Sequence, residues 1–121
     1  MNVLEAIKTR RTIRKYEGRE VPREALLRVL EAATWAPSHH DSQPWEFHLL
    51  TGEKIRALSS IFTRIRGAEL EGSDMPPAKK EARMEFARTL GGAPLLVAVE
   101  VVVADEEVEM EERMQAVAAA I

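Results

Sequence analysis

The chain has 121 residues, a length that fits one domain, and it contains no cysteine. The absence of cysteine excludes disulfides, thiolate metal ligands, iron–sulfur clusters and a catalytic thiol. With 45% hydrophobic and 31% charged residues and a net charge of −3, the composition is typical of a soluble globular protein and does not favour a dedicated nucleic-acid binder. The longest apolar stretch, 93–103, is too short to cross a bilayer, and the N-terminus lacks a signal-peptide core. We therefore expect a cytoplasmic protein that binds neither membranes nor nucleic acid.

The charge is unevenly distributed along the chain. Six basic residues and one acid lie between Lys8 and Arg19, whereas six acids and no base lie between Asp105 and Glu112. A local excess of positive charge favours anionic ligands. The basic N-terminal segment is therefore the first candidate for binding chemistry.

The first third of the chain predicts two helices. Val3, Leu4 and Ile7 recur at helical spacing after Asn2, which is a favourable N-cap residue. Pro22 is predicted to open the second helix, whose apolar stripe ends before Pro37. The segment between the helices, around Gly18, predicts a turn.

The remaining elements are two strands and three helices. A strand is predicted over Trp45–Leu50, with Trp45 and Phe47 on the core side, and a helix over 55–65. Residues 67–77 predict an irregular connection, and 79–90 a helix that ends at Gly91. Leu95–Val103 has the pattern of a strand covered on both faces, and the apolar, Ala-rich stretch 110–121 predicts that the sequence stops inside a core helix. This order predicts a mixed α+β layered fold.

Arg10, Thr12 and Arg14 stand at alternate positions after the first predicted helix. In an extended or turning backbone, such residues can point the same way. Two guanidinium groups and a hydroxyl suit a phosphate and the polar edge of a heterocycle. A solvated basic patch fits the same residues. This motif alone leaves both interpretations open.

A polar loop, 37–44, is fixed by a proline at each end and lies between a predicted helix and a predicted strand. Polar side chains held in this way are typical of binding loops. Adjacent histidines rarely chelate one ion, and no thiolate or third histidine lies nearby, so we predict no metal site at His39 and His40. A hydrolytic triad of Ser38, His39 and Asp41 is disfavoured because the three lie too close in sequence.

Together these segments resemble the nitroreductase family. The resemblance rests on Arg-Arg-Thr-Ile-Arg near the N-terminus, a helix opened by Val-Pro, and Ala-Pro-Ser-His-His-Asp-Ser-Gln-Pro-Trp-Glu-Phe before a strand. It covers all 121 residues and is closest to the shortest members, in which a histidine follows the first polar residue of the loop, as His39 follows Ser38. It implies an incomplete α/β/α sandwich with helices around a small sheet. Residues 1–121 would then be the N-terminal part of a single domain.

The resemblance also implies a function. Family members are homodimers that hold one FMN per active site between the subunits and move a hydride from NAD(P)H to small oxidants such as nitroaromatics or quinones. No side chain need act as a nucleophile, so no catalytic residue is predicted. Asp41 occupies a loop position where relatives often carry asparagine, and an ionised acid there would oppose flavin reduction.

Eight positions are expected to bind the cofactor. Arg10 and Thr12 would bind the FMN phosphate and ribityl chain, with Arg11 beside them, and Arg14 would lie near the pyrimidine edge of the isoalloxazine. The other subunit would pack four loop residues against the same flavin: Pro37, Ser38, His39 and Gln43.

Two alternatives remain. The abrupt Ala-Val-Ala-Ala-Ala-Ile end also fits a truncated, non-catalytic paralogue that acts as a dimerisation or interaction module without flavin. Nucleic-acid binding through 10–19 is disfavoured because such surfaces interleave aromatic residues, which this segment lacks.

Overall fold

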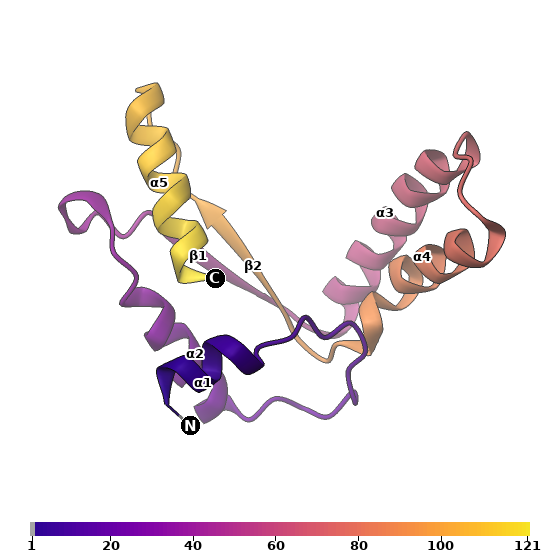
Figure 1. Ribbon diagram of the computed structural model, residues 1–121, viewed down its shortest axis with the longest axis horizontal. Helices are drawn as coiled ribbons and strands as arrows, with labels where there is room; N and C mark the ends of the chain where they lie inside the picture. Colours follow the sequence, from indigo (N-terminus) through magenta and orange to yellow (C-terminus); the bar gives the residue numbers. More distant parts are fainter. Residues whose placement is uncertain (1) are drawn as a thin grey trace. The chain divides into compact units, whose positions relative to one another are not determined.

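The computed structural model describes residues 2–121, which form two compact units. One unit combines the chain up to Arg19 with 56–93, and the other combines 20–55 with 94–121. The elements, labelled in Figure 1, are α1 (Val3–Thr9), α2 (Arg23–Thr34), the 3-10 turn η1 (His39–Asp41), β1 (Trp45–Leu50), α3 (Gly52–Glu71), α4 (Pro77–Thr89), the 3-10 turn η2 (Leu90–Gly92), β2 (Leu96–Val101) and α5 (Glu107–Ala120).

The first unit contains α1, most of α3, and α4. Helix α1 begins where the sequence predicts, because the Asn2 side chain accepts a hydrogen bond from the Glu5 amide while the Glu5 side chain accepts one from the Asn2 amide. Helices α3 and α4 lie side by side (Figure 1). Ser59 joins them, since its buried hydroxyl donates to the carbonyls of Ala87 and Arg88 near the end of α4.

Ser59→Ala is expected to lower the free energy of unfolding by about 1 kcal/mol, because it removes a buried hydrogen bond. Ser60→Ala, at the exposed neighbouring position, is the matched control and should change stability by less than about 0.5 kcal/mol. Urea unfolding followed by circular dichroism measures both. Equal stabilities would show that the Ser59 hydroxyl does not hold the two helices together.

The second unit is built on an antiparallel pair of strands. Trp45 lies opposite Val101 and Phe47 opposite Val99, so four apolar side chains share one face of the pair. Helix α5 covers this face with Ala116 and Val117. Trp45 is only 8% exposed and lies in the centre of this core. The predicted strand Trp45–Leu50 and the core position of Trp45 are both confirmed.

Several predicted boundaries are wrong. Pro22 is the N-cap of α2 and not its first residue. Helix α3 continues to Glu71, so the irregular link before α4 is much shorter than 67–77. Gly67 lies within a helical turn because an isolated glycine costs a helix only about 1 kcal/mol, which neighbouring helix formers offset.

The coverage of β2 and α5 also differs from expectation. Strand β2 is shorter than Leu95–Val103, and Val97 is 38% exposed, because α5 packs on one face of the pair only. Helix α5 buries Ala116 and Val117, while Met114 is 55% exposed. Among residues 2–121, then, the apolar side chains of these two elements are only partly covered.

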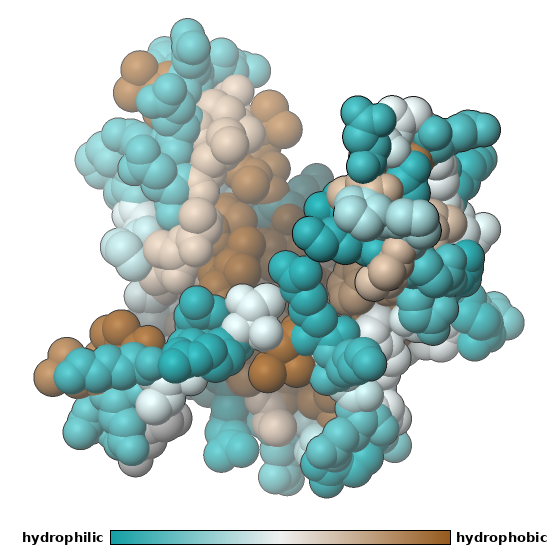
Figure 2. Space-filling view, turned by 45° about the vertical axis from the view of Figure 1, so that its right-hand side comes forward, coloured by the Kyte–Doolittle hydropathy of each residue, from teal (hydrophilic) through white to brown (hydrophobic). Residues whose placement is uncertain are grey.

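Large apolar side chains remain at the surface of both units. Figure 2 shows brown apolar groups among the teal polar ones. The most exposed include Trp35 at 83% and Val3 at 75%. Among the described residues, no large side chain is less than 2% exposed. Exposed apolar patches of this kind mark surfaces that pack against another chain or segment. None of the described helices combines the length and apolarity needed to span a membrane.

Candidate functional site

The loop between α2 and β1 folds around Ser38. The Ser38 hydroxyl accepts a hydrogen bond of 3.1 Å from the Gln43 amide, and the Ser38 carbonyl accepts one of 3.2 Å from the Asp41 amide. The Gln43 side chain in turn donates to the Asp41 carboxylate at 3.2 Å. These bonds close the loop on itself, so its backbone is fixed before any ligand binds.

The backbone of this loop is strained. His40, Asp41 and Gln43 have φ values of 50°, 54° and 44°, in the left-handed region that residues other than glycine seldom adopt. Each such residue costs roughly 1 kcal/mol or more and persists only where its surroundings hold it. Left-handed residues gather at ligand-binding segments. The strain therefore supports the prediction that this loop binds a ligand.

An open hollow of about 310 Å³ lies between the loop and α5. Three of the predicted cofactor-binding residues, Pro37, Ser38 and His39, line one side of it. Glu112, Gln115 and small side chains of α5 line the other. Its volume is at the lower end of the range, about 300–1,000 Å³, that ligand sites occupy. Gln43 is not among the lining residues.

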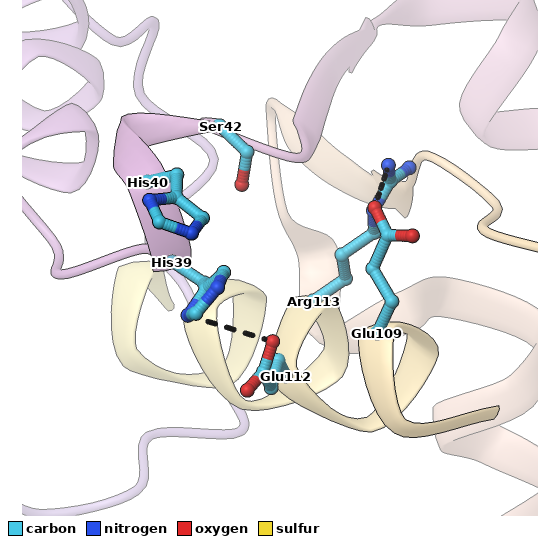
Figure 3. A pocket seen from close by; sticks show the side chains of 6 residues that line it. All are labelled: His39, His40, Ser42, Glu109, Glu112 and Arg113. Carbon is cyan, nitrogen blue, oxygen red and sulfur yellow. Dashed lines mark hydrogen bonds and ion pairs between the residues drawn. The ribbon is translucent and has the colours of Figure 1, made fainter. Parts of the chain in front are cut away.

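A smaller pocket of about 100 Å³ adjoins this hollow (Figure 3). His39 faces Glu112 across it, with Nδ1 3.6 Å from the carboxylate. On the other side, Arg113 donates to Glu109 and to the carbonyls of Val102 and Val103, which directly follow β2. Arg113 thereby fixes α5 to the sheet, which holds Glu112 beside the loop.

Ser38→Ala is expected to weaken ligand binding at the loop by about 5-fold, because the loss of an ordinary hydrogen bond costs about 1 kcal/mol and frees the strained backbone. Ser42→Ala is the control: Ser42 lines the small pocket, and no hydrogen bond of its side chain is present within 2–121. A titration that follows FMN fluorescence measures the affinity, since FMN is the cofactor that the resemblance implies. If the two variants bind equally well, the Ser38 hydroxyl does not shape the site.

The basic motif belongs to the other unit and follows α1 as an extended segment. Arg10, Thr12 and Arg14 are exposed, and within residues 2–121 their side chains make no hydrogen bond or ion pair. Their guanidinium and hydroxyl groups are therefore available to a ligand. The Arg11 guanidinium instead donates to the carbonyls of Lys8 at 3.0 Å and Arg10 at 2.8 Å, which caps the end of α1.

One group of possible metal ligands occurs in the described part of the chain, away from the predicted site residues. Glu46, His48 and Glu100 lie on the exposed face of the strand pair, with their ligand atoms within 4.8 Å of one another. Glu46 and Glu100 are directly opposite in register, and like charges in that position repel. His48 lies 3.0 Å from Glu100, within hydrogen-bond distance, and 3.8 Å from Glu46. Exposed polar contacts across the strand pair account for the cluster.

Sequence reasoning missed Glu112 and Gln115. Glu112 belongs to a run of acids that predicts only a solvated surface, and Gln115 to a stretch that predicts a core helix. The available signal was helical spacing: Gln115 and Ala116 follow Glu112 by three and four residues, and Ala119 follows them by four and three, so all lie on one face of α5. The sequence could not show that this face lies against the loop.

The strand pair covered by α5 and the strained polar loop before β1 define an α+β protein with a candidate ligand site at one end of a strand. Residues 7–121 match the nitroreductase family. The chain belongs to this family.

Curated relatives and solved structures agree with this assignment. The chain is 60% identical over 55 residues to a putative NADH dehydrogenase/NAD(P)H nitroreductase of Methanothermobacter thermautotrophicus, covering 46% of this chain and 29% of the relative. It is 34% identical over 99 residues to a 4-nitrobenzoate reductase of Nocardioides, covering 74% and 40%. The chain thus spans less than half of these curated relatives.

Among solved structures, the FMN-dependent nitroreductase NfnB from Mycobacterium smegmatis in complex with NADPH matches with a TM-score of 0.71 at 21% identity. This match covers 97% of this chain and 67% of that one. A nitroreductase-like protein from Bacillus cereus matches with a TM-score of 0.73 at 21% identity, covering 99% and 60%. At these identities the matches establish the fold, so the predicted nitroreductase-like α+β fold is confirmed.

Proposed function

We propose that this protein is an FMN-dependent oxidoreductase that moves a hydride from NAD(P)H to small oxidants such as nitroaromatics or quinones. The observation that carries the proposal is the pair of unengaged arginines, Arg10 and Arg14, in a chain of the nitroreductase family. Relatives named as 4-nitrobenzoate reductase and as NAD(P)H nitroreductase support the class of reaction. The FMN-dependent structural match supports the cofactor.

The residues present fit FMN. Phosphate is an anion that guanidinium groups bind through paired, charge-assisted hydrogen bonds, and Arg10 with Thr12 offers such a group and a hydroxyl. Arg14 is proposed to lie at the pyrimidine edge of the isoalloxazine, where a positive charge stabilises the anionic reduced form. Arg11 adds positive charge nearby while its side chain caps α1.

The loop is proposed to cover the isoalloxazine of the partner subunit's site. Pro37, Ser38 and His39 line a hollow whose volume lies within the range of ligand sites. The Gln43 amide is hydrogen-bonded to the Ser38 hydroxyl. When bound, FMN would supply the redox chemistry of hydride transfer. The protein's residues would bind, orient and shield from water, without acting as nucleophile or general base.

We further propose a cytoplasmic homodimer. Each unit carries exposed apolar residues, Leu4 and Ile7 on α1 in one, and Val29 on α2 with Trp35 just after it in the other. They support surfaces that another subunit covers. Sedimentation of the purified protein tests this directly. If the protein were a monomer at micromolar concentration, the loop could not cover the isoalloxazine of a partner subunit, and that part of the proposal would be wrong.

Turnover tests the proposed reaction. The FMN-loaded protein should lose its yellow colour with NADH or NADPH under anaerobic conditions and regain it when 4-nitrobenzoate or a quinone is added. A protein that binds FMN but is not reduced would contradict the oxidoreductase proposal. A protein that takes up no FMN would favour a non-catalytic dimerisation or interaction module.

A further inference from the structure

The turn η2 approaches the basic motif closely. Leu90, Gly91 and Gly92 all have positive φ, at 47°, 71° and 76°, and together reverse the chain after α4. The Gly91 carbonyl accepts a hydrogen bond of 2.9 Å from the Tyr16 amide. This bond connects the turn to the segment that carries Arg14, within the same unit.

Only glycine fits at position 91. A Cβ atom there would lie less than 3.0 Å from the Arg14 carbonyl oxygen, closer than real Cβ atoms essentially ever approach another heavy atom. It would also lie 3.1 Å from the Arg14 carbonyl carbon and 3.2 Å from the Tyr16 ring. The obstacle is backbone, which cannot rotate away as the end of a side chain can. Any side chain at position 91 must therefore displace Arg14.

The segment that would move is closed on itself. The Tyr16 hydroxyl donates to the Ile13 carbonyl at 3.0 Å, so the residues around Arg14 form one small loop. Its bond to Gly91 anchors this loop to η2. A shift at Arg14 would thus be transmitted to the whole loop and would not be absorbed by one side chain.

We propose that Gly91 is a positioning residue for the cofactor site: its missing side chain lets the Arg14 backbone rest against η2, which sets where the Arg14 guanidinium meets FMN. This inference rests on the proposed function. Gly91 touches no cofactor itself and acts through Arg14. Because the strength of a charge-assisted hydrogen bond depends on its geometry, a displaced Arg14 guanidinium is expected to bind FMN more weakly.

A double-mutant cycle tests the proposal, with the dissociation constant for FMN as the readout. Gly91→Ala should weaken FMN binding by about 10-fold, and Arg14→Ala should weaken it by about as much, since each removes one charge-assisted contact. In the Gly91→Ala background, Arg14→Ala should add less than about 3-fold, because the guanidinium is already displaced. Additive effects would show a general structural defect and overturn the inference.

Two glycines provide matched controls. Gly92→Ala introduces alanine at a φ of 76° in the same turn, but its Cβ would lie 3.5 Å from the nearest atom, the Tyr16 carbonyl oxygen, which is an ordinary contact. Gly52→Ala introduces alanine at a φ of 50°, where no heavy atom would lie within 4 Å of the added Cβ. Both carry the strain of positive φ without the clash, and both should bind FMN within about 3-fold of wild type. Losses equal to that of Gly91→Ala would contradict the proposal.

A measurement on the wild-type protein covers the case in which Gly91→Ala does not fold. If Arg14 binds FMN while its segment rests on Gly91, saturation with FMN should slow hydrogen exchange of the Tyr16 amide at least several-fold. An unchanged rate would overturn the inference. Failure of wild type to bind FMN would instead refute the proposed function, so the two failures are distinguishable.

Discussion

Replacing Arg10 and Arg14 together with alanine is expected to weaken FMN binding by about 100-fold or more, because each charge-assisted hydrogen-bonding group contributes about 1.5–3 kcal/mol. Neither side chain has a partner within the described residues, so their removal should leave the fold intact. The measurement is a titration of FMN fluorescence at fixed ionic strength. Unfolding by urea should show the same free energy as wild type, within about 0.5 kcal/mol.

The matched control is Arg28→Ala with Arg64→Ala. These exposed arginines lie on α2 and α3, and their removal changes the net charge equally. Since general electrostatic attraction is screened by salt, the control should bind FMN within about 3-fold of wild type at 0.15 M salt. If both double variants lose the same affinity, net charge and not the Arg10–Arg14 motif attracts the ligand.

Trp45→Ala is expected to have the largest effect on stability, a loss of about 3–5 kcal/mol in the free energy of unfolding. Trp45 is 8% exposed and packs against Ala116 and Val117, so its removal leaves a cavity at the centre of the second unit. A domain is usually stable by only about 5–15 kcal/mol, so at the lower end of this range the loss would remove most of the stability. Because β1 follows the binding loop directly, loop ligands should be lost as well.

The chain's other tryptophan provides the control. Trp35 is 83% exposed at the end of α2, and Trp35→Ala should change the stability of the isolated chain by less than about 0.5 kcal/mol. Circular dichroism follows both urea transitions, because the tryptophan that Trp45→Ala retains is already exposed in the folded chain and its fluorescence would report unfolding weakly. Similar losses for the two variants would contradict the core described for the second unit.

Local sequence signals predicted the elements well. The N-cap at Asn2, the alternation from Trp45 and the glycines after Leu90 each act through the backbone of a few neighbouring residues. Such signals are contained in the sequence window itself. The predicted end of α3 was wrong because the helix propensity of the neighbouring residues outweighed the glycine at position 67.

The candidate site was only partly predictable. Residue types and spacing indicated Arg10, Thr12, Arg14 and the loop, because phosphate and heterocycle binding require those side chains. Two contacts join residues more than 70 positions apart: His39 with Glu112, and Gly91 with Arg14. Pairings of that kind depend on how the helices and strands pack, which no local pattern specifies.

Equilibrium titration of the purified wild-type protein with FMN and with riboflavin tests the central claim most directly. Riboflavin lacks the phosphate, so we expect saturable FMN binding that is at least about 10-fold tighter than riboflavin binding, consistent with one charge-assisted contact. Equal affinity for the two flavins would contradict the assignment of Arg10 and Thr12 to the phosphate. No saturable binding of either flavin would contradict the assignment of all three residues, Arg14 included, to the cofactor site.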